Sequence, residues 1–229
     1  VGSIPSSLGN LTQLHILYLI SNKLTGKIPA TLGSCSQLID LRLGFNPLRG
    51  SIPSELGMLI NLQVLSLYTA NLDGPLPVEL CNCTQMVWFD VGWMSRSDHF
   101  SFLPPGYPVS LGLTGSIPEC FSRLANLKIL GLVGNNLQGS IPAWLGALEG
   151  LTMLDLGHNH LTGSIPSSVG RLKNTETLAL NNNRLSGNIP PEVGALTKLQ
   201  RLDLSTNNLQ GFIPVHHLHN LTALQVLRL

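Results

Sequence analysis

The chain has 229 residues, of which 43% are hydrophobic and 11% are charged, and its formal net charge at pH 7 is +1. So small a charge excludes the electrostatic surface that a nucleic-acid or anionic-membrane binder needs. No apolar run in the sequence approaches the roughly 20 residues that span a bilayer. Any partner must therefore be recognised by shape and local chemistry.

An Ile-Pro or Leu-Pro dipeptide recurs along the whole sequence. It begins at Ile4, Ile28, Ile52 and Leu76, and again at Ile117, Ile141, Ile165, Ile189 and Ile213. The step is 24 residues within each group and 41 residues between Leu76 and Ile117, which is 17 residues more. This spacing predicts nine stacked units or part-units, with one insertion after the strand of the fourth unit.

A full unit reads LTMLDLGHNHLTGSIPSSVGRL, from Leu151 to Leu172. Its LxL part favours a short strand whose alternate side chains turn inward. Such a strand cannot bury its apolar face alone, so consecutive units should stack into a parallel sheet over one continuous core. The rest of each unit is too short and too often broken by glycine for a full helix, which predicts short helical turns on the opposite side.

The unit resembles the leucine-rich repeat, and its LxGxIP half resembles the plant-specific class of that repeat, over essentially the whole chain. The resemblance implies an α/β repeat fold, a curved solenoid with a parallel β-sheet on its concave face and short 3-10 or helical turns on its convex face. We expect residues 1–229 to form a single solenoid fragment of about nine units without terminal caps. An island at about residues 93–112 should interrupt it.

An asparagine follows most of the predicted strands. These residues are Asn22, Asn46, Asn135, Asn159, Asn183 and Asn207. A buried amide can satisfy backbone groups in two neighbouring turns, so the set predicts a structural ladder. The ladder should fail beside the insertion, where Ala70 and Met94 take the equivalent positions in the third and fourth units.

The insertion is rich in aromatic and charged residues, although the chain has few aromatics overall. The residues are Trp93, Arg96, Asp98, His99, Phe100, Phe102 and Tyr107. Loops of this length are usually functional or disordered, and the aromatic content disfavours disorder. In plant receptor kinases that sense steroids or small sulfated peptides, such an island forms part of the ligand site, so the resemblance implies that role here. The alternative is a neutral loop insertion.

Outward strand positions supply further candidate ligand-binding residues, and their large aromatics are confined to the first four units. The set is Tyr18, Arg42, Phe45, Tyr68, Trp88 and Asp90. Together with Trp93, three of these aromatics should form a diagonal stripe across about three strand spacings of ~4.8 Å. The stripe lies beside the charged pair Arg42 and Asp90, as an interface hot spot requires. Alternatively, the aromatics merely suit strands, and Asp155 and Asp203 should be solvated strand residues.

The four cysteines fall into two pairs. Cys35 and Cys83 lie two units apart, which is too far to bridge, so we expect buried free thiols. Cys81 and Cys120 lie on consecutive units on either side of the insertion. They are either a disulfide around its base or two further free thiols.

Three Asn-x-Thr sequons fall at one convex position of their units and favour a secreted, glycosylated protein. They begin at Asn10, Asn82 and Asn220. A histidine cluster at His216, His217 and His219 invites a zinc interpretation, but no cysteine or carboxylate lies near it in the repeat register. We expect neither a metal nor a cofactor.

The sequence offers no nucleophile, base and orienting acid at neighbouring concave positions and no phosphate-binding loop, so we do not expect an enzyme. The resemblance implies a ligand-sensing fragment of a plant cell-surface receptor, outside the plasma membrane or secreted. Its partners would be a peptide or small molecule and a co-receptor ectodomain, without nucleic acid or membrane contact. The alternative is a secreted inhibitor of pathogen cell-wall hydrolases, similar to polygalacturonase-inhibiting proteins. A regular ice-binding ladder is disfavoured by the irregular strand columns.

Overall fold

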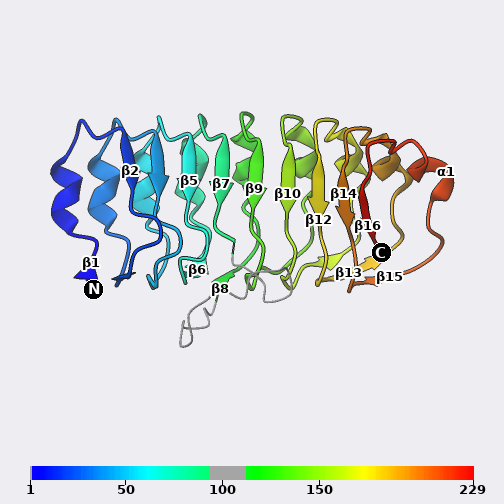
Figure 1. Cartoon of the computed structure of the whole chain (residues 1–229), viewed down its shortest axis with the longest axis horizontal. Helices are drawn as coiled ribbons and strands as arrows, with labels where there is room; N and C mark the ends of the chain where they lie inside the picture. The colour runs from blue at the N-terminus through cyan, green and yellow to red at the C-terminus, as the bar shows by residue number, and fades with distance from the viewer. Residues whose placement is uncertain (1, 93–111) are drawn as a thin grey trace.

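The computed structural model describes residues 2–92 and 112–229, in which one parallel sheet runs the length of the molecule (Figure 1). Its strands, in spatial order, are β2 (Ile16–Tyr18), β4 (Asp40–Arg42), β5 (Val64–Ser66), β7 (Trp88–Asp90), β9 (Ile129–Gly131), β10 (Met153–Asp155), β12 (Thr177–Ala179), β14 (Arg201–Asp203) and β16 (Val226–Arg228). Each strand pairs in register with the strands of the units before and after it. The fold is the α/β repeat that the sequence predicts.

A layer of short 3-10 helices lies behind the sheet (Figure 1). The helices are η1 (Ser6–Asn10), η2 (Ala30–Ser34), η3 (Ser54–Met58), η4 (Val78–Asn82), η5 (Glu119–Arg123), η6 (Ala143–Ala147), η7 (Ser167–Arg171) and η8 (Pro191–Ala195). The proline of each Ile-Pro or Leu-Pro dipeptide stands immediately before its helix, with φ between about −60° and −70°, the value that its ring imposes. The last unit has a short α-helix instead, α1 (Val215–Leu218). No helix among the described residues is long and apolar enough to cross a membrane.

Two-, three- and four-residue strands make small parallel sheets where the chain leaves each turn. They are β1 (Gly2–Ser3) with β3 (Leu24–Thr25), β6 (Asp73–Pro75) with β8 (Gly112–Thr114), and β11 (Thr162–Gly163), β13 (Arg184–Gly187) and β15 (Asn208–Leu209). The glycine of the LxGxIP motif has a positive φ in these segments, +81° at Gly26 for example, which a side chain would strain. The motif therefore fixes the return of the chain toward the helix layer.

The core is a continuous column of leucines between the sheet and the helices. The middle residue of each inner strand points inward, and Leu41, Leu65 and Leu154 are fully buried. Each such side chain contributes roughly 1.5–3 kcal/mol by its removal from water. Phe89 of β7 and Phe121 of η5 replace aliphatic residues in the units on either side of the insertion, and their rings pack edge to face with centroids 5.6 Å apart.

The asparagines after the strands join neighbouring units through the backbone. In the middle of the array, Asn159 donates through Nδ2 to the carbonyls of Leu132 and Leu156 at 3.0 and 3.1 Å. Its Oδ1 accepts from the N–H of Leu137 at 3.0 Å. The same pattern recurs at Asn46, Asn135, Asn183 and Asn207. Asn22 is exposed and donates only within its own turn.

The ladder is interrupted at Ala70, where backbone hydrogen bonds satisfy two of the groups that an asparagine side chain would bond. The N–H of Leu48 donates to the carbonyl of Asn46 at 2.7 Å, and the N–H of Ala70 donates to the carbonyl of Leu67 at 3.0 Å. A cavity of about 10 Å³ remains beside Ala70, large enough for about one water molecule. The second expected interruption, Met94, lies outside the described residues.

The insertion leaves the stacking of the units unchanged. Trp88 of β7 pairs with Ile129 of β9, 41 residues on, in the same register in which Val64 pairs with Trp88, 24 residues on. A disulfide joins Cys81 of η4 to Cys120 of η5, with their Cα atoms 5.7 Å apart. The units on either side of the insertion are thus linked through the sheet, the core and a covalent bond.

Candidate functional site: the concave surface

Two columns of side chains project from the concave face of the sheet. The last strand residues stack as Tyr18, Arg42, Ser66, Asp90, Gly131, Asp155, Ala179, Asp203 and Arg228. The first strand residues stack as Ile16, Asp40, Val64, Trp88, Ile129, Met153, Thr177, Arg201 and Val226. The residues between them point into the core, so these two columns and the turn that follows each strand define the surface open to a partner.

Four residues of β2, β4 and β7 form a compact group, which we call the Arg42 cluster: Tyr18, Asp40, Arg42 and Trp88. The guanidinium of Arg42 donates through Nε and Nη2 to the two carboxylate oxygens of Asp40 at 2.8 and 2.9 Å. Its Cζ lies 4.9 Å from the ring centroid of Tyr18 and 5.1 Å from that of Trp88. The hydroxyl of Tyr18 donates to Asp40 at 2.8 Å. A bidentate ion pair between two aromatic rings holds the cluster in one arrangement.

Asp40 corrects one expectation from the sequence. Arg42 is paired with Asp40 on its own strand and not with Asp90, the charged residue expected beside it. Asp40 occupies the first strand position, as Trp88 does, but was not among the residues expected on this surface. Two-residue alternation along a strand places Asp40 and Arg42 on the same face, so this signal was available.

The pKa values of the cluster reflect these contacts. The pKa of the Tyr18 hydroxyl is raised, first because it donates to Asp40, which favours the protonated form. The pKa of Arg42 is also raised, first by its hydrogen bonds to Asp40. Both residues thus keep their protons under all ordinary conditions and act as hydrogen-bond donors.

A second aromatic contact joins the turn after β4 to the turn after β5. Phe45 and Tyr68 pack edge to face with ring centroids 5.5 Å apart. Phe45 adopts a left-handed conformation with φ of +55°, and its N–H donates to the carbonyl of Tyr68. The described part of the expected stripe therefore divides in two, with Tyr18 packed on Arg42 and Phe45 packed on Tyr68.

Asp90 occupies a half-buried position at the end of β7. Its Oδ1 accepts from the N–H of Gly92 at 3.0 Å. Burial raises its pKa to about 6, because the ionised form loses hydration, although the hydrogen bond from Gly92 partly opposes this effect. A Cβ on Gly131 of the neighbouring strand would lie 2.6 Å from the same oxygen, so glycine there leaves room for the carboxylate.

The concave face of β10 to β14 is polar. The expectation that Asp203 is solvated there is wrong. Asp203 is only 1% exposed and is not a solvated strand residue. It accepts from Arg201 and Arg228 at 3.2 Å each, and from the hydroxyl of Ser205 at 2.7 Å. Asp155 is half-buried and accepts from the N–H of Gly157.

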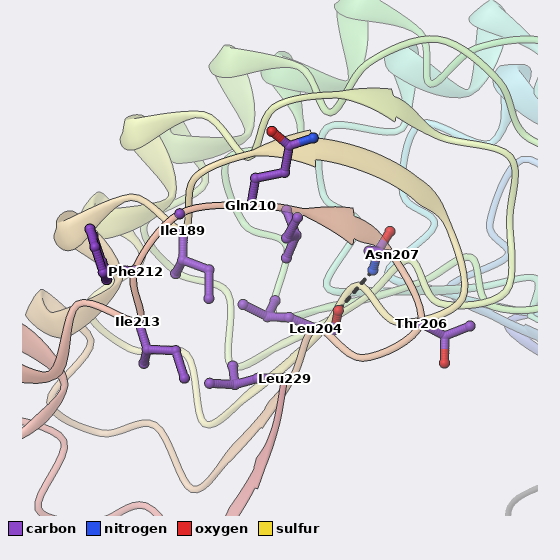
Figure 2. Close-up of a pocket in the computed structure, with 10 residues that line it drawn as sticks. Ile189, Leu204, Thr206, Asn207, Gln210, Phe212, Ile213 and Leu229 are labelled. Carbon is purple, nitrogen blue, oxygen red and sulfur yellow. Dashed lines mark hydrogen bonds between the residues drawn. The ribbon is translucent and has the colours of Figure 1, made fainter.

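A shallow hollow of about 320 Å³ lies over this polar half. Its lining is Val133, Met153, Asp155, His158, Thr177, Ala179, Asn181 and Arg201. A second hollow, of about 210 Å³, lies beside β16 at the end of the apolar core. Figure 2 shows Ile189, Ile213 and Leu229 turned toward the same space there, while Phe212 stands apart and is 97% exposed.

The remaining candidates either lie off the concave surface or outside the described residues. Trp93, Arg96, Asp98, His99, Phe100, Phe102 and Tyr107 lie outside the described residues. The sequon asparagines Asn10, Asn82 and Asn220 are exposed and lie at or just after the helices η1, η4 and α1. Cys35 and Cys83 are buried free thiols, and burial raises the pKa of both, that of Cys83 to about 11. Within the described part, no group of three His, Cys, Asp or Glu side chains could hold a metal ion.

Comparison with known proteins places this architecture in a class of repeat proteins. A family profile described as "Leucine-rich repeat region" matches residues 114–229, and one described as "Leucine Rich Repeat" matches residues 13–35. The chain belongs to the leucine-rich repeat family. A search of curated proteins gave no match.

Similar solved structures come largely from plant receptors. The plant peptide hormone receptor RGFR1, in complex with RGF2, is 35% identical with a TM-score of 0.89, over 100% of this chain and 34% of the receptor. The Arabidopsis receptor kinase HAESA, in complex with the peptide hormone IDA and the co-receptor SERK1, is 36% identical with a TM-score of 0.82, over 93% of this chain and 33% of HAESA. A plant ice-binding protein is 30% identical with a TM-score of 0.69, over 93% of this chain and 63% of that protein. The chain spans about a third of the length of the two receptors.

Proposed function

We propose that this chain is a ligand-recognition segment of a plant cell-surface receptor ectodomain and that it binds a peptide on the concave surface of β2 to β7. The observation that carries the proposal is the Arg42 cluster with the adjacent Phe45–Tyr68 pair. Exposed, preorganised aromatic and arginine side chains are the residues that dominate binding energy at interfaces. The similar receptors RGFR1 and HAESA were solved with peptide hormones, which supports a peptide as the ligand class.

The proposal includes the segment 93–112 and a second protein. In the sequence two residues separate the segment from β7, whose Trp88 belongs to the Arg42 cluster, so its aromatic residues are proposed to complete the ligand site. HAESA was solved with the co-receptor SERK1 as well as its peptide. A rigid solenoid has little internal switch of its own, so we propose that a bound peptide acts here by completing a surface for a co-receptor ectodomain outside the cell.

The experiment is the selection of binders from a displayed library of random 12-residue peptides, followed by affinity measurement with variants. We expect Tyr18→Ala and Tyr68→Ala to weaken the selected peptides about tenfold or more, because each removes a packed ring from the interface. Met58→Ala, which shortens an exposed side chain on η3 of the opposite layer, is the matched control and should change nothing. Equal effects of all three variants would contradict binding on this surface.

A second variant tests the inserted segment. Replacing residues 93–112 by a three-residue turn restores the 24-residue length of an ordinary unit. Loss of peptide binding with an unchanged far-UV circular dichroism spectrum would support a role of the segment in the site. Unchanged binding would remove the segment from the proposal.

A further inference from the structure

The Arg42 cluster also indicates which kind of peptide it takes, an inference that rests on the proposed function. We infer that the cluster recognises an uncharged peptide segment. Arg42 would donate hydrogen bonds to backbone carbonyl oxygens, and an apolar or aromatic side chain would pack on Tyr18 and Trp88. An acidic or sulfated side chain would be disfavoured at this position.

The charge of Arg42 is already compensated. Asp40 holds the guanidinium through two hydrogen bonds of 2.8 and 2.9 Å, and the carboxylate is itself largely buried, with 12% of its side chain exposed. Asp90 adds a further carboxylate in the same column, two strands on, where the backbones are about 10 Å apart. An incoming anion would gain attraction from one guanidinium and meet repulsion from two carboxylates. The local charge balance therefore gives an anionic group no net attraction.

The hydrogen-bonding capacity of Arg42 is not used up by Asp40. A guanidinium carries five N–H donors, and the ion pair uses two of them, on Nε and Nη2. The other three N–H groups donate to no acceptor among the described residues, and 27% of the side chain is exposed. Since arginine can only donate, the complementary ligand group is an acceptor. A neutral carbonyl oxygen meets this need without adding charge.

The rings supply the apolar part of the surface. Tyr18 is 52% exposed although its hydroxyl is anchored on Asp40, so its ring is held in place and still accessible. Trp88 is half-buried, and its ring contacts the guanidinium of Arg42. It stands on β7, whereas Tyr18 stands on β2, and β4 with Arg42 lies between these two strands in the sheet. Rings fixed in this way lose little conformational freedom when a ligand packs on them. An uncharged ring or branched apolar side chain is the group that fits.

The test uses the displayed random 12-residue library on the whole chain, with peptides that also bind Arg42→Gln removed by subtraction. We expect the remaining peptides to share an uncharged position occupied by a ring or apolar residue. Their affinity should change less than about twofold between 50 and 500 mM NaCl, because no net charge is neutralised. Enrichment of Asp, Glu, Lys or Arg at the shared position, or a steep dependence on salt, would overturn the inference.

The variant Asp40→Asn tests whether the Asp40 carboxylate determines which peptide is bound or only supports the fold. This change leaves Arg42 uncompensated, so a peptide with Glu at the shared position should lose at least tenfold in affinity for the wild type but much less for Asp40→Asn. Glu79→Gln, an exposed carboxylate on η4, is the control, and a thermal melt of each variant checks folding. If Asp40→Asn does not fold, Arg42→Lys provides the second test, since it keeps the charge but loses the bidentate geometry and should weaken the selected peptides.

The outcomes distinguish this inference from the proposed function. If the peptides selected without the subtraction against Arg42→Gln depend on Tyr68 and all bind that variant unchanged, the inference is overturned and the proposed function stands. A library that yields no peptide dependent on any concave residue would overturn both. An equal penalty for the Glu-containing peptide in the wild type and in Asp40→Asn would overturn the inference alone.

Discussion

The two halves of the concave sheet use the same backbone and differ in what they present. Strands β2 to β7 carry aromatic rings beside a partly buried ion pair, Arg42 with Asp40. Strands β9 to β16 carry polar side chains around Asp203, a nearly buried carboxylate that holds two arginines from adjacent strands. The register of the strands is unchanged from one half to the other. The repeat therefore fixes where a side chain stands, and the variable positions decide what it can bind.

The halves also differ in how their units are held together. From β9 onward the asparagine ladder is continuous from Asn135 to Asn207. In the first half it breaks at Ala70, one unit before the insertion. There the Phe89–Phe121 contact and the Cys81–Cys120 disulfide connect the units on either side of the insertion. Regular hydrogen bonding stabilises one half, and irregular packing with a covalent bond stabilises the region around the insertion.

The largest effect is expected from breaking the ladder where it is continuous. Asn159→Ala leaves the N–H of Leu137 without a partner in a buried turn. It also removes the hydrogen bonds of Asn159 to the carbonyls of Leu132 and Leu156, which still accept from Asn135 and Asn183. The orphaned N–H costs about 1–3 kcal/mol and each of the two lost hydrogen bonds about 1 kcal/mol more, so we expect the free energy of unfolding to fall by about 3–5 kcal/mol. Urea unfolding followed by circular dichroism measures this loss. Asn22→Ala, at the exposed end of the ladder, should cost less than about 1 kcal/mol, and equal losses would contradict a cooperative ladder.

A similar loss is expected from removing the covalent link at the insertion. The disulfide closes 39 residues, for which the chain-entropy model gives about 4 kcal/mol. The variant Cys81→Ser with Cys120→Ser should therefore have a lower melting temperature than the oxidised chain. Reduction with dithiothreitol should lower the melting temperature of the wild type to about that of the variant. A melting temperature unaffected by reduction would show that the link does not support this region.

A smaller, pH-dependent effect is expected at Asp90. Its pKa in the folded chain, about 6, lies above the ordinary value of 3.8, so the folded state binds the proton more tightly than the unfolded state. The free energy of unfolding should therefore fall as pH rises from about 4 to about 6 and remain lower above that range. Asp90→Asn should stabilise the chain at pH 7.5 by up to about 3 kcal/mol. The gain should shrink toward pH 4, and a gain equal at both pH values would contradict a buried ionising carboxyl.

The fold could be predicted almost completely from the sequence, because each unit repeats the same local requirements. The leucine spacing sets the strand, the asparagine sets the turn after it, and the Ile-Pro dipeptide sets the start of the helix. The 24-residue spacing then sets how the units stack. Cys81 and Cys120 could be identified as possible partners, but only the three-dimensional spacing of η4 and η5 brings their Cα atoms to 5.7 Å.

The candidate site could be predicted only in part, because its contacts join side chains across strands. Tyr18, Arg42 and Trp88 were all candidates, but the contacts of both rings with Arg42 depend on side-chain length and direction. Arg42 reaches the ring of Trp88 from two strands away. The burial of Asp203 was not predicted either, although Arg201 stands two residues before it on β14 and Arg228 is its register partner on β16. The place of Trp93, Phe100 and Tyr107 in the site remains a prediction from the sequence.

The most direct test of peptide binding on β2 to β7 is a crystal structure of the chain with a peptide recovered from the library. We expect the peptide to lie across β2 to β7, with a carbonyl oxygen within about 3 Å of Arg42 and an uncharged side chain against Tyr18 or Trp88. A peptide bound over the polar hollow of β10 to β14, or on the helical layer behind the sheet, would contradict it.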